Sequence, residues 1–161
     1  MQARFDPILA GLAEGTVVPY LGPGALAGVV DPQSGRAIPA DSESLILAIN
    51  EGRPMAPKLM YEFSRAAMNV ELKRGRSALT RQLDAVYRDT AWSGSALHSW
   101  LAGKRLPYVV DSNRDTLLQQ ACADTPHTLI VGVARIGGTA YRFRLYHYDG
   151  TAYLPIEQEA V

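Results

Sequence analysis

An apolar run that ends on two closely spaced glycines constrains this chain more than any other feature. Residues 15–26 read Gly-Thr-Val-Val-Pro-Tyr-Leu-Gly-Pro-Gly-Ala-Leu. The pattern predicts a β-strand from about Val17 to Leu21 and then a glycine loop that opens a helical turn. Loops at this place in α/β proteins hold phosphates and dinucleotides, because glycine lets the backbone approach a ligand closely. An ordinary strand-to-helix turn is the alternative, and this run by itself does not separate the two.

The composition predicts one soluble domain. The chain has 161 residues, 47% of them hydrophobic, which is enough for one filled core. Its 16 basic and 16 acidic residues cancel, so no overall charge attracts nucleic acid or an anionic membrane. The single Cys122 rules out an internal disulfide, and with three histidines it makes no usual zinc cage. No run approaches the roughly 18 apolar residues of a membrane span, so we expect a cytoplasmic protein without metal, nucleic acid or membrane as partner.

Helical spacing dominates the first two thirds of the chain. We expect a short leading helix that begins near Asp6 and a helical insert over about residues 42–103. Asp41 or Ser42 is the expected N-cap of the first insert helix, and Pro57 is the expected start of the next one. Apolar residues recur at helical spacing in the insert, and we assign them to the core: Leu45, Ile46, Ile49, Leu59, Phe63, Ala66, Ala67, Val70, Leu79, Leu83 and Val86.

A second strand, a polar turn and a short helix follow in that order, over residues 106–110, 111–115 and 116–121. Ser112 or Asn113 has the chemistry of a helix cap, which is the plainest interpretation of this turn. Three further strand-like runs occupy the last thirty residues, separated by Gly-Gly and Asp-Gly. Locally they predict an antiparallel meander, whereas the first half of the chain predicts a parallel sheet, and the pattern leaves this open.

Four stretches carry a further signal because they occur in a fixed order. They are residues 17–26, the Ile-Pro segment 37–42, the run 97–118 from Leu-His through Asp-Ser-Asn-Arg-Asp to Leu-Leu, and Leu-Tyr-His-Tyr-Asp-Gly at 145–150. Together they resemble the sirtuin-like NAD-binding domains, and most closely a short, divergent member of the bacterial branch that lacks the zinc module. The resemblance implies a single Rossmann-like α/β domain over residues 1–161, with a mainly parallel sheet and room for an antiparallel C-terminal hairpin.

The resemblance also implies a nucleotide site and a reaction. The glycine loop would hold the pyrophosphate of NAD, and the cofactor-binding residues would be Gly22, Pro23, Gly24, Ala25, Ser112 and Asp115. Asn113 would face the nicotinamide-side ribose, and His147 would act on a ribose hydroxyl or orient a water. Histidine suits that role because its ordinary pKa of about 6.5 leaves much of it neutral near pH 7. Hydrolysis of NAD is therefore expected, and the missing zinc cysteines argue against lysine deacetylation.

Several residues depart from the family pattern. Pro23 removes a backbone N–H from the loop, Asp111 adds negative charge, Arg114 replaces an apolar or aromatic residue, and two residues separate His147 from Gly150. These departures favour a second hypothesis, in which a non-enzymatic module binds a partner or forms a homo-oligomer. His147 also has the strand parity of its apolar neighbours, so a buried or hairpin histidine is the alternative to catalysis.

Overall fold

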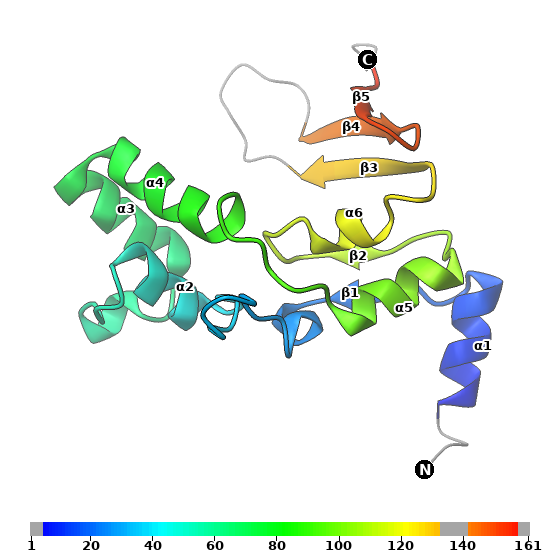
Figure 1. Cartoon of the computed structure of the whole chain (residues 1–161), viewed down its shortest axis with the longest axis horizontal. Helices are drawn as coiled ribbons and strands as arrows, with labels where there is room; N and C mark the ends of the chain where they lie inside the picture. The colour runs from blue at the N-terminus through cyan, green and yellow to red at the C-terminus, as the bar shows by residue number, and fades with distance from the viewer. Residues whose placement is uncertain (1–4, 133–141, 158–161) are drawn as a thin grey trace. The chain divides into compact units, whose positions relative to one another are not determined.

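The structure is a computed structural model that describes residues 5–132 and 142–157 of the chain. It is a mixed α/β protein whose strands form a two-stranded parallel sheet and a three-stranded antiparallel sheet (Figure 1). The chain divides into two compact units, Met1–Leu118 and Gln119–Val161, and each is described by itself. The expected single domain stays a prediction.

The first unit begins with a helix whose ends follow local rules. α1 spans Asp6–Glu14, with Pro7 in its first turn, where a missing N–H costs no hydrogen bond. Gly15 ends the helix in the left-handed conformation, at φ +73°, which glycine adopts without the Cβ penalty. The predicted leading helix is confirmed.

The helical insert is also confirmed. Its helices are α2 (Ser42–Ile49), the 3₁₀ turn η3 (Pro57–Leu59), α3 (Phe63–Arg74), α4 (Arg76–Tyr87) and α5 (Ala96–Lys104). Asp41 caps α2: its carboxylate accepts the Ser44 N–H at 2.8 Å, and the Ser44 hydroxyl lies 3.3 Å from the Asp41 N–H. Pro57 starts only a single 3₁₀ turn, so the predicted helix start there is wrong and α3 begins at Phe63 instead.

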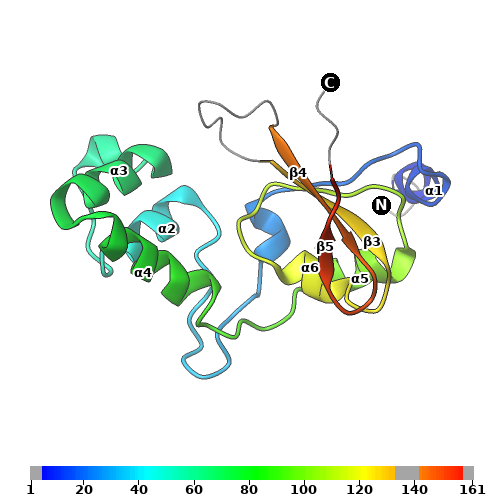
Figure 2. The ribbon, with the colours of Figure 1, turned by 90° about the horizontal axis from the view of Figure 1, so that it is seen from above.

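The helices α2, α3 and α4 share one core, and Figures 1 and 2 both show them grouped together. Its fully buried members are Ile46, Ile49, Ala66 and Val70, with Met55, Met60, Phe63, Ala67, Leu79 and Leu83 packed around them. Apart from Met55 and Met60, which were not predicted, these residues come from the predicted apolar stripes, because one face of each amphipathic helix must be removed from water.

The parallel sheet joins two segments that lie far apart in the sequence. β1 spans Tyr20–Leu21 and β2 spans Val110–Asp111, with Tyr20 opposite Val110. The Val110 N–H donates to the carbonyl of Pro19 at 3.0 Å, which extends the pairing by one residue. Leu21 is buried with Ala25 and with Leu101 of α5, so this helix covers one face of the pair. Both strands are shorter than predicted.

The second unit is an antiparallel meander. β3 (His127–Gly132), β4 (Phe143–Tyr148) and β5 (Tyr153–Pro155) pair in sequence order, with β4 in the middle (Figure 1). This decides the question of strand direction that the sequence left open. The expected mainly parallel sheet is wrong for the described residues: the short turn between β4 and β5 reverses the chain, and a parallel connection would need a crossover of a dozen residues or more.

Candidate functional site

The loop after β1 contains the predicted glycines. η2, a 3₁₀ turn over Pro23–Leu26, follows Gly22 directly, and the Ala25 N–H donates to the Gly22 carbonyl at 2.9 Å. Neither Gly22 nor Gly24 has a positive φ, and a Cβ built on either one meets no atom within 4 Å. The fold itself therefore does not require glycine at these two positions, and both are open to an approaching group.

The turn after β2 is tied to that loop by side-chain hydrogen bonds. The Asn113 amide nitrogen donates to the Gly22 carbonyl at 3.1 Å and to Asp111 Oδ1 at 2.8 Å. The Ser112 hydroxyl donates to the Leu21 carbonyl at 2.7 Å. The structure thus brings together three predicted site residues, Gly22, Ser112 and Asn113, from segments about ninety positions apart.

Asp115, rather than Ser112 or Asn113, caps the start of helix α6 (Leu117–Ala121). Its Oδ1 accepts the N–H of Leu117, the first residue of α6, at 2.9 Å. The plain interpretation of Ser112 or Asn113 as the cap of this helix is therefore wrong. Asp115 is buried, and its second oxygen has no hydrogen-bond partner among the described residues. Burial raises the pKa of the nearby Tyr87 hydroxyl, while the charge of Arg114 lowers that pKa and the charge of Asp115 raises it.

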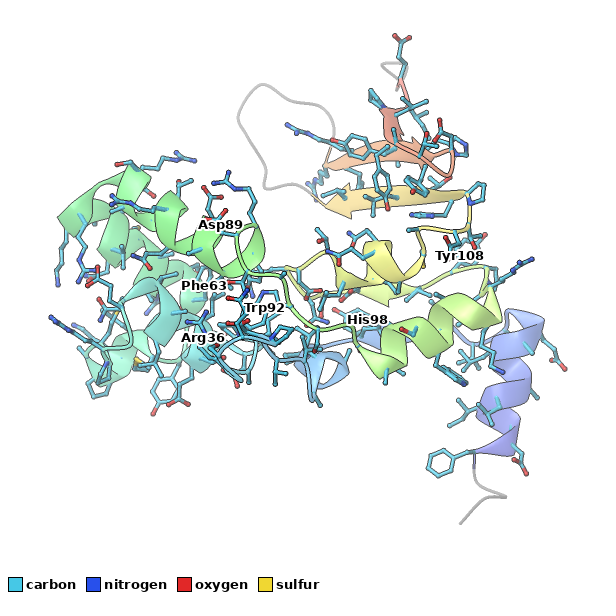
Figure 3. All side chains as sticks on the ribbon, in the orientation of Figure 1. Arg36, Phe63, Asp89, Trp92, His98 and Tyr108 are labelled. Atoms are coloured by element: carbon cyan, nitrogen blue, oxygen red, sulfur yellow. The ribbon has the colours of Figure 1, made fainter. Side chains whose placement is uncertain are left out.

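A hydrogen bond joins the start of α5 to the glycine loop. The hydroxyl of Ser95, the N-cap of α5, donates to the Ala25 carbonyl at 2.8 Å, and both residues are buried. His98, labelled in Figure 3, is completely buried one turn further along, and its two ring nitrogens have no hydrogen-bond partner in the described part of the chain. Of the predicted loop residues, Ala25 therefore faces the interior, whereas Pro23 and Gly24 are exposed.

His147 lies in the second unit. It is in the middle strand β4, opposite Thr128 of β3 and Leu154 of β5, and it is exposed. The alternative of a buried core histidine is therefore wrong. Asn113 belongs to the first unit, so the pairing of Asn113 with His147 as catalytic residues stays a prediction.

Sequence reasoning missed two residues whose long-range contacts lie near the candidate site, Ser95 and Arg114. Ser95 lies three positions before His98, a spacing typical of an N-cap, but its hydrogen bond to Ala25 spans 70 positions and has no local signal. Arg114 was noted only as a departure from the family pattern. Its guanidinium lies over the ring of Phe63, 4.8 Å from the centroid.

The described residues contain neither a group of side chains suited to a metal ion nor a helix suited to a membrane span. In residues 5–132 and 142–157, no three His, Cys, Asp or Glu side chains are grouped so that they could hold a metal ion. None of the helices described there is both long and apolar enough to cross a membrane.

Comparison with protein-family models, with curated proteins and with solved structures finds no match to this chain. The geometry of the loop and turn therefore carries the functional argument that follows.

Proposed function

We propose that the chain binds NAD or a related ADP-ribose nucleotide where the β1 loop meets the turn after β2. One observation carries the proposal: the Asn113 amide holds this turn against the carbonyl of Gly22. Both segments follow the carboxyl ends of parallel strands, where open α/β sheets bind nucleotides in the crevice beyond the strands. A Rossmann-like, sirtuin-like fold and a cytoplasmic location with access to NAD belong to the same proposal.

The atoms that remain open suit a ribose-phosphate ligand. The Asn113 amide nitrogen already donates twice, to Gly22 and Asp111, so its carbonyl oxygen is the atom left to face a ligand. An amide oxygen accepts hydrogen bonds, and ribose hydroxyls donate them. Gly22 and Gly24 add backbone without side chains, which fits the close approach of a pyrophosphate.

With NAD as substrate, the reaction we propose is hydrolysis to nicotinamide and ADP-ribose. The bond from ribose carbon to nicotinamide nitrogen breaks, its electron pair stays on that nitrogen, and the ribose carbon becomes oxocarbenium-like. Asn113 Oδ1 would stabilise the ribose, and the water that adds to the carbon would give its proton to a base, for which His147 is the candidate that the sequence supplies. A neutral imidazole has a ring nitrogen that can accept this proton.

A second candidate function is a non-enzymatic module that binds a partner or forms a homo-oligomer, with a degenerate nucleotide site. Pro23 has no N–H, and η2 is a four-residue 3₁₀ turn rather than a longer helix, so the loop supplies few donors. The Asp111 carboxylate, which accepts two hydrogen bonds from Asn113, also lies within this turn. Negative charge and missing donors reduce the stabilisation available to an anionic ligand and favour this candidate.

Binding of ADP-ribose, measured by calorimetry, tests the site itself. Gly24→Ala places a methyl group where the chain has open space, so we expect about a tenfold or larger loss of affinity, or about 1.4 kcal/mol or more. Folding should be unchanged, or slightly stabilised through the unfolded state. Gly103→Ala is the matched control, because this glycine of α5 is also exposed and also has open space around it.

Nicotinamide release from NAD then separates the two candidates. Turnover that is lost in both Asn113→Ala and His147→Ala supports hydrolysis. ADP-ribose binding without nicotinamide release indicates a nucleotide site without turnover, and the absence of both binding and release at high protein concentration supports the second candidate. Equal binding by wild type, Gly24→Ala and Gly103→Ala contradicts the placement of the site.

A further inference from the structure

Arg114 follows Asn113 of the proposed site, and its guanidinium lies over an aromatic ring. Arg114 directly follows Asn113, whose amide reaches Gly22, so its Cα lies about 3.8 Å from that of a residue tied to the glycine loop. Its guanidinium rests over Phe63, the first residue of α3, and Figure 3 labels this ring. An aromatic platform restricts a long side chain and thereby lowers the entropy lost when it binds a ligand.

The positive charge of Arg114 has no carboxylate partner in the described part of the chain. Arg65, Arg74 and Arg88 each pair with a carboxylate, at 2.8, 3.4 and 2.9 Å. Asp111 Oδ1 accepts from Asn113 and Asp115 Oδ1 accepts from Leu117, and neither carboxylate forms an ion pair with Arg114 in the described residues.

The positive charge of Arg114 would offset two features of the loop and turn that disfavour an anionic ligand. Pro23 contributes no N–H, and Asp111 brings a negative charge into the turn. A guanidinium is always charged at physiological pH, and its planar fork matches the oxygens of a phosphate.

We propose that Arg114 binds a phosphate of the nucleotide and makes the site selective for phosphorylated ligands over nucleosides. This inference rests on the proposed function. It would allow a loop that contains proline and lies next to an aspartate to bind an anionic ligand. It also assigns Phe63 a role as the platform that positions the guanidinium.

Arg36 offers a matched control. Its guanidinium lies over the ring of Trp92, 5.7 Å from the centroid, so it too is an arginine held on an aromatic side chain. Asp31 lies near Arg36 in a turn, and the charge of Arg36 contributes to the lowered pKa of that carboxyl, after the hydrogen bonds from Ser34 and Gln33. Its charge is thus partly balanced within the chain. Figure 3 labels both Arg36 and Trp92.

The experiment is calorimetric titration of the full chain with ADP-ribose and, separately, with adenosine, which has no phosphate. Arg114→Gln should weaken ADP-ribose binding about tenfold or more, because a charge-assisted hydrogen-bonded pair is lost. Arg114→Lys, which keeps the charge but not the fork, should fall between Arg114→Gln and wild type. Arg36→Gln should bind as wild type does, and adenosine affinity should not depend on Arg114. Tryptophan fluorescence confirms that each variant is folded.

The outcomes separate the two proposals. If wild type binds ADP-ribose and Gly24→Ala does not, but both Arg114 variants bind normally, the site stands and the role of Arg114 is overturned. An equal loss in Arg36→Gln and Arg114→Gln also overturns it, because the effect is then one of general charge. If Arg114→Gln does not fold, Arg114→Lys decides: unchanged affinity together with unchanged salt dependence contradicts the proposal. If wild type binds no ADP-ribose, both proposals fall.

Discussion

The hydroxyl of Ser95 links the start of α5 to the glycine loop, and its removal should destabilise the first unit. It donates to the buried carbonyl of Ala25 at 2.8 Å and lies 3.3 Å from the N–H of His98. Ser95→Ala therefore removes a helix cap and leaves the carbonyl of Ala25 without this donor. The substitution keeps the helix propensity high, so the lost hydrogen bonds dominate the result.

The expected magnitude follows from these two contacts. The cap bond is long, so its loss should cost about 0.5–1 kcal/mol, at the lower end for N-caps. A buried carbonyl left without a partner costs about 1–3 kcal/mol. Both contacts share one hydroxyl, so we expect about 2 kcal/mol rather than the sum of the upper limits.

Urea unfolding followed by tryptophan fluorescence measures this loss. Trp92 and Trp100 are the only tryptophans of the chain, and both lie in the first unit, so the signal reports on that unit. Asp41→Ala is the control, because it removes an exposed cap of α2 that has no long-range hydrogen bond, and it should cost about 1 kcal/mol. A loss for Ser95→Ala that is no larger than the loss for Asp41→Ala would refute the argument that α5 holds the loop.

Two further predictions concern other parts of the chain. Ile49→Ala removes a fully buried side chain from the core of α2, α3 and α4 and should lower the free energy of unfolding by about 2–5 kcal/mol in the same urea assay, whereas a loss under about 1 kcal/mol would contradict that core. The Thr151 hydroxyl, followed by the N–H groups of Ala152 and Thr151, lowers the pKa of Asp149 from 3.8 to about 2 in the turn between β4 and β5. Since the folded pKa is the lower one, the stabilisation from Asp149 is complete above about pH 4 and is lost as the pH falls through 2. An NMR titration of the Thr151 amide should show a midpoint near 2, and a midpoint near 3.8 would exclude these hydrogen bonds.

The helices were predictable because their signals are local. The Asp41 cap, the proline in the first turn of α1 and the apolar stripes of the insert all act within a few residues of chain, and each is found where expected. The start of α3 was not predictable from Pro57. A proline permits a helix start, but the buried side chains decide how far the helix extends.

The candidate site was predictable as a list of residues but not as an arrangement. Gly22 and Asn113 stand out in the sequence, yet their hydrogen bond joins positions 91 residues apart. The roles of Ser95 and Arg114 depend on contacts with Ala25 and Phe63, which are distant in the sequence. Such partners come from packing, which no local pattern encodes.

The sequence by itself determined the mixed α/β class, the helical insert and the Asp41 cap that starts it, because propensity, capping and apolar periodicity act over a few residues. Only the tertiary structure decided that β1 pairs in parallel with β2, that the last three strands form a meander, and that the Asn113 turn lies against the glycine loop. Strand partners and long-range hydrogen bonds depend on which distant segments can bury apolar surface and satisfy backbone groups together, and that choice is made by the whole fold.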